Sequence, residues 1–334
     1  MSHHQPNKAL VLDYFSAMDR ASVETVESVL LRYHSTDYTF RGVHPFNEQS
    51  STSSVAEFVW KPLIRSLSNL QRRQDVFMAG ESEIADDQWV MSMGHFMGLF
   101  DHDWLGIRAT RKVAMLRYAE FSRVEDGKIT QTGLWLDILG FMRQAGVNPL
   151  PMETGHYFVY PGPINHDGLL YDSHAEEEGR HTLELLNRMI ADLDLLNKSG
   201  EDHCPPEYLA RTWHENMCWY GPAGIGATYT IRRYQEQHQY PFRQGLTDKT
   251  YNGHVCRFAE GNYACFFGWP NLTHRPTGGF MGLPGSTPTD MRVVDVYRRE
   301  GEKLAENWVL IDIPYWLLQQ GVDVLERTRQ IVTP

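Results

Sequence analysis

The chain repeats itself, and this internal repeat constrains its fold more than any other feature of the sequence. Residues 123–147 read RVEDGKITQTGLWLDILGFMRQAGV, and residues 298–322 read RREGEKLAENWVLIDIPYWLLQQGV. The two segments align without a gap at an offset of 175 positions. Because 334 residues are about twice the length of a typical domain, the repeat predicts two copies of one domain, at 1–155 and 156–334.

Two further matches extend the repeat toward the start of each copy. Residues 94–100 read GHFMGLF and residues 278–284 read GGFMGLP, at an offset of 184 positions. Since this offset exceeds 175, we expect copy one to hold nine extra residues after this match, near the segment FDHDWLGIR. A weaker match relates residues 37–45 to 216–224, and both segments have the pattern of a strand that leads into a loop.

Each copy opens with helical periodicity and ends with the period-two alternation of strands. The expected helices are 9–18, 23–33 and 55–67 in copy one, and 182–196, 207–217 and 225–237 in copy two. The expected strands are 75–79, 88–96, 112–124 and 129–136, then 255–259, 263–269, 291–299 and 304–311. This order indicates the α+β class. We expect two tandem cone-shaped domains, each with N-terminal helices packed on a curved antiparallel sheet above a cavity.

Composition and charge exclude several classes of partner. A net charge of −11 argues against nucleic acid, whose binding needs clustered basic residues. There is neither a long apolar run nor a signal-like start, so we expect no membrane association and a cytoplasmic location. The four cysteines lack metal-ligand spacing, and the His and Asp cluster within 95–103 falls beside the expected insert, which copy two lacks. We therefore expect no metal site.

On the last strand of each copy, a tryptophan and an aspartate share one face. Because strand residues an even number of positions apart point the same way, Trp135 lies with Asp137, and Trp308 lies with Asp312. A carboxyl in an apolar strand needs a partner, a raised pKa or a wet cavity. With a raised pKa it can take a proton from carbon beside a carbonyl and return one to oxygen. The alternative is that each aspartate caps the helix that follows.

Other aromatic and histidine side chains are candidates for the wall of a binding pocket. Core burial is the default for a tryptophan, but Trp219 and Trp269 lie near glycines and prolines, which makes them better pocket candidates than the other tryptophans. His238, His274 and His95 could donate a hydrogen bond to a carbonyl or assist proton transfer. The alternative for each is a structural or surface histidine.

Both copies resemble the SnoaL-like polyketide cyclases of the nuclear-transport-factor-2-like superfamily. In copy two the resembling stretches are WYGPAGIG from Trp219, HQYPF from His238, GGFMGLP from Gly278, and NWVLID from Asn307 before LLQQG. Copy one resembles the family through GHFMGLF, the turn EDGKI, and LWLD before MRQAG, and it is the more divergent unit. The resemblance covers nearly the whole chain and implies two cone-shaped α+β domains.

In these cyclases the last-strand aspartate is the acid/base of an intramolecular aldol closure that needs no cofactor, so the resemblance nominates Asp312 and Asp137. We therefore expect a cofactor-independent acid/base enzyme that acts on a small hydrophobic or aromatic carbonyl compound. One alternative is a non-catalytic protein that binds a small molecule. Another is an isomerase or dehydratase of ketosteroid-isomerase type, with Tyr229 or Tyr263 as the hydrogen-bond donor. Related domains dimerise, so we expect a pseudo-dimer within the chain and allow for a homodimer.

Overall fold

The computed structural model describes residues 4–199, 204–285 and 287–332. The chain divides into two compact units that interleave along the sequence. Unit 1 comprises Met1–Pro149, Ile164–Ser173 and Asp323–Pro334, and unit 2 comprises Leu150–Pro163 and His174–Val322. The expected boundary between residues 155 and 156 stays a prediction. None of the described helices is long and apolar enough to span a membrane.

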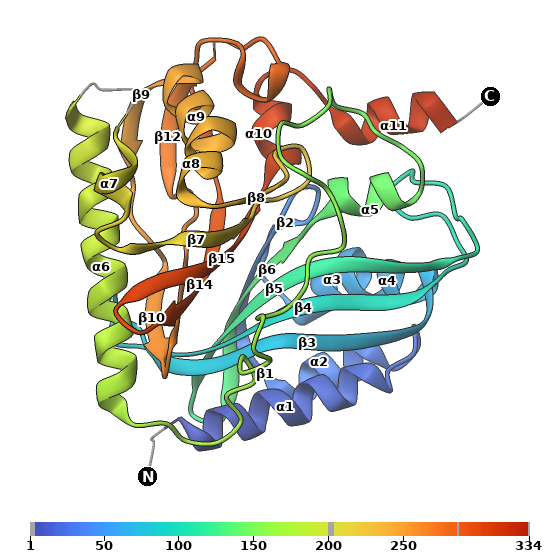
Figure 1. Cartoon of the computed structure of the whole chain (residues 1–334). Coiled ribbons are helices and arrows are strands. Elements are labelled where there is room, and N and C mark those ends of the chain that lie inside the picture. Colours follow the sequence, from blue (N-terminus) through green and yellow to red (C-terminus); the bar gives the residue numbers. More distant parts are fainter. Residues whose placement is uncertain (1–3, 200–203, 286, 333–334) are drawn as a thin grey trace. The chain divides into compact units, whose positions relative to one another are not determined.

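Unit 1 is a six-stranded sheet with helices on one face (Figure 1). Its helices are α1 (Gln5–Asp19), α2 (Val26–Tyr33), α3 (Thr52–Val55), η1 (Ala56–Trp60), α4 (Lys61–Ser66), α5 (Ile138–Gln144) and α11 (Val324–Val332). Its strands are β1 (His34–Gly42), β2 (Asn47–Gln49), β3 (Leu67–Glu81), β4 (Gln88–Phe100), β5 (Val113–Glu125) and β6 (Lys128–Leu136). The order is β2-β1-β6-β5-β4-β3, and every pair is antiparallel except β1 with β6.

Unit 2 has the same architecture with its outer strands interrupted. Its helices are α6 (Glu176–Ser199), α7 (Pro206–Leu209), α8 (Ile231–Tyr234), η2 (Gln235–Gln239), α9 (Tyr240–Gly245), η3 (Phe280–Gly282) and α10 (Ile313–Gln319). Its strands are β7 (Trp213–Tyr220), β8 (Ala227–Tyr229), β9 (Leu246–Tyr251), β10 (Cys256–Glu260), β11 (Tyr263–Phe267), β12 (Leu272–Pro276), β13 (Thr289–Met291), β14 (Val293–Glu300) and β15 (Lys303–Ile311). The main sheet has the order β10-β11-β14-β15-β7-β8, and β13-β12-β9 form a second sheet.

Strand register confirms the repeat at the end of each copy. Thr132 of β6 lies beside Phe40 of β1, and Asn307 of β15 lies beside Trp219 of β7, again 175 positions further along the last strand. The parallel pairing therefore makes Phe40 and Trp219 equivalent, as the weak match of 37–45 with 216–224 predicts. The two units are copies of one α+β fold.

The match between GHFMGLF and GGFMGLP is wrong as a structural equivalence. Residues 94–100 lie in β4, whereas 278–284 form a loop with the short helix η3. Register instead pairs Trp89 of β4 with Arg123, and Tyr263 of β11 with Arg298, an offset of 174. The loops between β4 and β5 and between β12 and β13 have equal lengths, so copy one has no nine-residue insert there. The hydrogen-bond register of the strands decides which residues are equivalent. A short shared sequence segment does not encode that register.

Two expected helices of copy two are also displaced. The segment 207–217 is helical only to Leu209, and β7 begins at Trp213, because its apolar residues pair in parallel with β15 instead of lining a helix face. The segment 225–237 contains β8, and the helix begins after Thr230, whose hydroxyl accepts a hydrogen bond from Arg233 N at 3.3 Å. This N-cap sets the helix start, as threonine commonly does.

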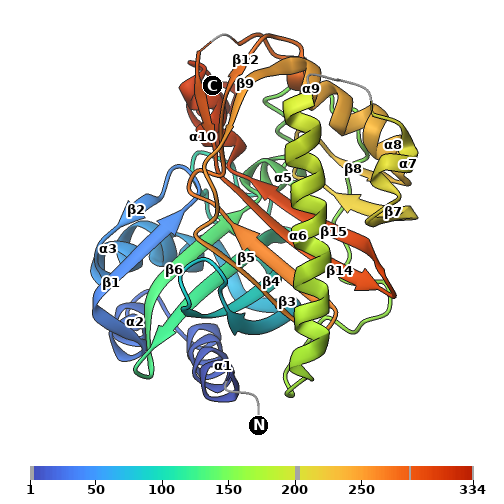
Figure 2. The same ribbon diagram turned by 90° about the vertical axis from the view of Figure 1, so that its left-hand side faces the viewer.

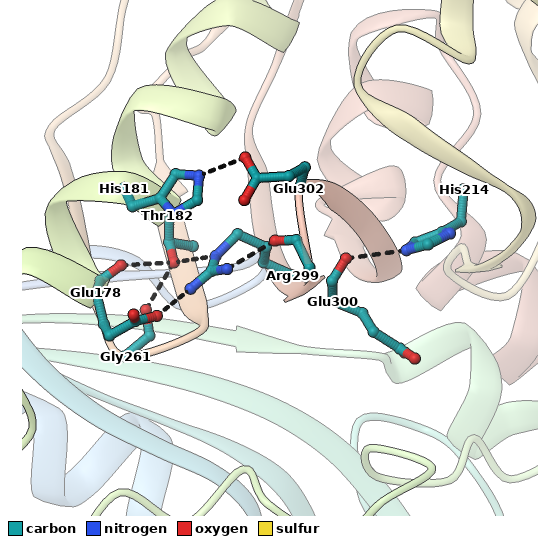
Figure 3. A network of polar contacts seen from close by, with 9 residues as sticks. Glu178, His181, Thr182, His214, Gly261, Arg299, Glu300 and Glu302 are labelled. Carbon is teal, nitrogen blue, oxygen red and sulfur yellow. Dashed lines mark hydrogen bonds and ion pairs between the residues drawn. The ribbon is translucent and has the colours of Figure 1, made fainter.

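Helix α6 runs across strands of the main sheet of unit 2 (Figure 2). Its first turns are bonded to the β14–β15 hairpin through Arg299, as Figure 3 shows. Nε of Arg299 donates to the Thr182 hydroxyl at 2.9 Å, another guanidinium nitrogen pairs with Glu178, and a third donates to Gly301 O at 2.7 Å. The Thr182 hydroxyl also lies 2.6 Å from Gly261 O. This network holds the strands that carry the candidate site against α6.

Candidate functional site

Unit 2 contains a cavity of about 460 Å³ between its helices and one face of its sheet. The sheet side is lined by alternate residues of two neighbouring strands: Val293, Asp295 and Tyr297 of β14, and Asn307, Val309 and Ile311 of β15. The opposite side is lined by residues of α6, α8, η2 and α9, among them Met189, Tyr234, His238 and Phe242. A volume of this size suits a small organic ligand, for which pockets measure roughly 300–1,000 Å³.

Asp295 is the buried carboxyl of this cavity. Tyr297 Oη donates to its Oδ1 at 3.1 Å, and Asn307 Nδ2 donates to the same oxygen at 3.2 Å. Asn307 Nδ2 also lies 3.2 Å from Val296 O, which fixes the amide. Both donors therefore converge on Oδ1 of a residue that lines the cavity.

Burial raises the pKa of Asp295 to about 6, and the hydrogen bonds from Asn307 and Tyr297 offset only part of that effect. Among the described residues, no basic side chain forms an ion pair with this carboxyl. A carboxyl with this pKa exchanges its proton near neutral pH, which is the range in which a general acid/base works best.

His238 lies on the helical side of the cavity. Its ring stacks on Trp219 with centroids 4.1 Å apart, and the ring of Phe242 is 5.6 Å away. Burial lowers the pKa of His238 to about 3, so the imidazole is neutral at physiological pH. Its Nδ1 is buried and has no hydrogen-bond partner among the described residues. A neutral imidazole can donate a hydrogen bond to a ligand oxygen without bringing a charge into the cavity.

A proline explains why His238 lies in a widened helical turn. Pro241 has no backbone N–H, so it cannot bond the carbonyl of Gln237 four residues earlier. The Thr154 hydroxyl donates to that carbonyl at 2.7 Å, and Tyr240 N bonds instead to Gln235 O, five residues back. Such π-type turns occur frequently at functional sites.

Of the residues predicted for copy two, Trp219 and His238 line the cavity, whereas Asp312 and Trp308 do not. Asp312 caps α10 by accepting from Tyr315 N at 3.2 Å, and it pairs with Arg292 at 3.2 Å. Trp308 Nε1 donates to Pro161 O at 3.0 Å. Since Asn307 and its alternate neighbours face the cavity, Trp308 faces the other side of the strand.

Trp269 and His274 also lie outside the cavity lining. The guanidinium of Arg292 lies 3.8 Å from the centroid of the Trp269 ring. His274 is buried and Nε2 accepts a hydrogen bond from Trp316 Nε1 at 2.8 Å. Burial lowers the pKa of His274 to about 4, so this histidine is neutral and internally bonded.

The residues predicted for copy one lie in unit 1. Asp137 caps α5 by accepting from Gly140 N at 2.9 Å, and Trp135 is fully buried. His95 is buried, with Nδ1 3.2 Å from Oδ2 of Asp75. Helix capping, the alternative considered for the last-strand aspartates, therefore holds in both units, and a catalytic role for either aspartate stays a prediction.

Asp295 and Tyr297 were not predicted from the sequence, although a signal was present. Asp295 is an acidic residue in the apolar strand VVDVY, and the repeat places Glu120 at the equivalent position of copy one. The tyrosines that line the cavity are Tyr234, Tyr251 and Tyr297, whereas the lining includes neither Tyr229 nor Tyr263, the donors considered for an isomerase.

Residues 14–145 match the model of the SnoaL-like polyketide cyclase family. No curated protein matches the chain. Similar solved structures include an NTF2-like protein from Burkholderia thailandensis E264, 20% identical over 43% of this chain and 98% of that one, with a TM-score of 0.31. IdmH from Streptomyces antibioticus, provisionally classed as a polyketide cyclase, is 20% identical over 41% and 98%, with a TM-score of 0.32. A protein of Jannaschia sp. CCS1, provisionally classed as a SnoaL-like polyketide cyclase, is 14% identical over 45% and 98%, with a TM-score of 0.35.

Proposed function

Residues 14–145 belong to the SnoaL-like polyketide cyclase family, and from this premise we propose that the chain is a cofactor-independent acid/base enzyme of cyclase type whose active site is the cavity of unit 2. Unit 2 shares the strand order and register of the unit that the family matches. The observation that carries the proposal is Asp295, a buried carboxyl with a pKa of about 6 on the wall of a largely apolar cavity.

An intramolecular aldol closure needs one group that removes a proton from the carbon beside a carbonyl and then delivers a proton to oxygen. In the proposed reaction, Oδ2 of Asp295 takes the proton while Tyr297 and Asn307 hold Oδ1. The carbanion then forms a carbon–carbon bond to a second carbonyl of the same molecule, and the resulting alkoxide takes the proton back from Oδ2. No oxidant or reductant is needed, so the step balances without a cofactor.

The remaining walls indicate the substrate class. Trp213, Trp219 and Phe242 line the cavity with aromatic surface, which suits a flat hydrophobic or aromatic carbonyl compound. The neutral imidazole of His238 supports the same proposal, because it can donate a hydrogen bond to the carbonyl oxygen on which charge develops. We propose His238 as a further polar group of the site, on the side of the cavity opposite the sheet that carries Asp295.

Asp312 and Asp137 remain the competing acid/base assignment. Each accepts a hydrogen bond from the first turn of the following helix, which supports a capping role in either unit. Asparagine is also a favoured N-cap residue, so the variants Asp312→Asn and Asp137→Asn retain capping while removing the carboxylate. They separate catalysis from capping.

The test compares wild type with Asp295→Asn and Asp312→Asn for turnover of, and binding to, a panel of cyclic and β-keto carbonyl compounds. We expect Asp295→Asn to lose turnover by a factor on the order of 10²–10⁴ while binding is kept. Loss with Asp312→Asn alone would transfer the acid/base role to that residue. Binding without turnover by wild type would favour the non-catalytic binding protein, and products with a moved double bond or lost water would favour an isomerase or dehydratase.

A further inference from the structure

The two units place a carboxyl at the same position of the same strand. Asp295 of β14 lies opposite Val309 of β15, and Glu120 of β5 lies opposite Leu134 of β6, 175 positions earlier in both strands. Glu120 is therefore the counterpart of Asp295 in unit 1. Both side chains are buried.

The two carboxyls differ in their partners. In unit 1, Nη2 of Arg72 lies 2.8 Å from Oε2 of Glu120, and both side chains are almost inaccessible to solvent. In unit 2, Asp295 accepts hydrogen bonds from two neutral donors, Tyr297 and Asn307. The carboxylate of Glu120 therefore faces a cationic partner, whereas the carboxyl of Asp295 is held by neutral donors alone among the described residues.

Aromatic rings complete the enclosure of the unit 1 pair. The guanidinium carbon of Arg72 lies 3.7 Å from the ring centroid of Phe15 and 4.7 Å from those of Phe96 and Tyr118. Glu120 corresponds by strand register to Asp295, which lines the cavity of unit 2. A substrate would have to displace a charged, stacked guanidinium to reach Glu120.

Strand register shows what replaces Arg72 in unit 2. Arg72 of β3 lies opposite Phe96 of β4, and Leu116 of β5 also lies opposite Phe96. The corresponding pairs in unit 2 are Leu272 with Tyr251 and Leu272 with Met291. The counterpart of Arg72 is therefore Tyr251, a half-exposed residue that lines the cavity. Unit 2 therefore has tyrosine where unit 1 has the arginine cation. The long strands β3 and β4 of unit 1 correspond to the shorter strands β9, β10, β11 and β12 of unit 2.

We infer that only unit 2 carries the chemistry, and that the ion pair of Arg72 with Glu120 closes unit 1 as a catalytically silent copy. This inference rests on the proposed function of the unit 2 cavity. The first copy is the unit that the family model matches, so family membership does not by itself identify the active copy.

The experiment combines unfolding and turnover of the full chain for Glu120→Leu, Arg72→Met and the double variant Arg72→Met/Glu120→Leu. Each single change leaves a buried partner uncompensated, so we expect a lower unfolding temperature for both single variants. The double variant replaces the pair by apolar groups and is expected to recover much of that loss. Turnover per folded molecule is expected to match wild type in all three variants, with Asp295→Asn as the inactive reference.

The outcomes separate this inference from the proposed function. A folded Glu120→Leu variant that loses turnover as Asp295→Asn does would overturn the inference, because Glu120 would then take part in catalysis. If the loss of stability in the double variant equals the sum of the two single losses, Arg72 and Glu120 are not coupled, and the inference that their pair closes unit 1 fails. If wild type turns over no compound of the panel, the proposed function fails, and the unfolding cycle still decides whether Arg72 and Glu120 are coupled.

Discussion

Tyr297 of β14 and Asn307 of β15 lie opposite each other in the strand pair, and both donate a hydrogen bond to the same oxygen of Asp295. This arrangement orients the carboxyl of Asp295 from the sheet side of the cavity. It also adjusts the proton affinity of Asp295, since hydrogen bonds to the charged form lower a pKa that burial raises. The pair therefore offers direct control over the proposed acid/base group.

Tyr297→Phe should shift the pH dependence of turnover upward. If Asp295 acts as the base, kcat/KM rises with pH as the carboxyl loses its proton, with a midpoint near the pKa of about 6. Removing the phenol hydroxyl takes away one hydrogen bond that lowers this pKa, so the midpoint should move to higher pH. A pH–rate profile of both proteins measures the shift. An unchanged or lowered midpoint would contradict the role of Tyr297.

Asp295→Asn should stabilise the folded protein at neutral and alkaline pH. The pKa of Asp295 is about 6 in the folded state against 3.8 as its ordinary value, so between these values the folded state binds more protons and stability falls as pH rises. The cost is absent below pH 3.8, is complete above about pH 6, and amounts to at most about 3 kcal/mol.

Denaturant unfolding of Asp295→Asn and wild type at pH 4 and pH 8 checks this prediction. The difference in unfolding free energy should be larger at pH 8. The control is Asp126→Asn, which removes an exposed turn carboxyl and should give the same small difference at both values. Equal differences for Asp295→Asn at the two pH values would contradict the buried, protonatable carboxyl.

His238→Phe should lower kcat while the protein stays folded. Phenylalanine can keep the ring against Trp219 but cannot donate a hydrogen bond, so a transition-state interaction worth on the order of 10²–10³ in rate is lost if His238 binds the developing oxyanion. His238→Gln returns a donor and should recover part of the rate. Nitrogen NMR of labelled histidine should show His238 neutral from pH 5 to 8, since burial lowers its pKa to about 3. Unchanged kcat in His238→Phe would exclude the proposed donor.

Asp312→Ala should destabilise the protein more than Asp312→Asn. Both variants lose the ion pair with Arg292, and removing one partner of a buried pair costs about 3–5 kcal/mol. Alanine also loses the N-cap hydrogen bond from Tyr315 N, which costs about 1 kcal/mol and which asparagine can keep. Thermal unfolding of both variants and wild type measures the two losses. An equal loss in the two variants would contradict the capping role of Asp312.

Much of the fold could be predicted from local patterns. The sequence predicts a strand on either side of the turn EDGKI, and the structure has β5 and β6 there. It also offers Asp137 as a helix cap, and this residue caps α5. The same pattern repeated 175 positions later predicts a second copy, which the register confirms. These features depend on neighbours within a few residues, so sequence carries them.

The GHFMGLF match shows where local patterns fail. A Cβ at Gly94 would lie 1.9 Å from the carbonyl oxygen of Arg73, so a glycine at this position allows β3 to approach β4 closely. Gly278 has φ of +95° in a loop with nothing within 4 Å of an added Cβ. Two glycines in nearly identical sequence segments are thus required for different reasons: one allows a close strand approach, and the other allows a positive φ. Only the surrounding backbone distinguishes these two cases.

By itself, the sequence determined that this chain is a duplicated α+β domain, because period-two strands, caps and turns are short-range properties that recur in both halves. It also placed a tryptophan near the end of each last strand, but the strands end at Leu136 and Ile311, and Asp137 and Asp312 cap the helices that follow. Only the tertiary structure decided which face meets a cavity, since that depends on the helices packed above it. It likewise decided that Glu120 faces Arg72, 48 positions away in the chain, while Asp295 meets only neutral donors among the described residues. The environment of a buried carboxyl is set by groups from distant segments of the chain. Residue spacing in the sequence does not show which of these groups come together.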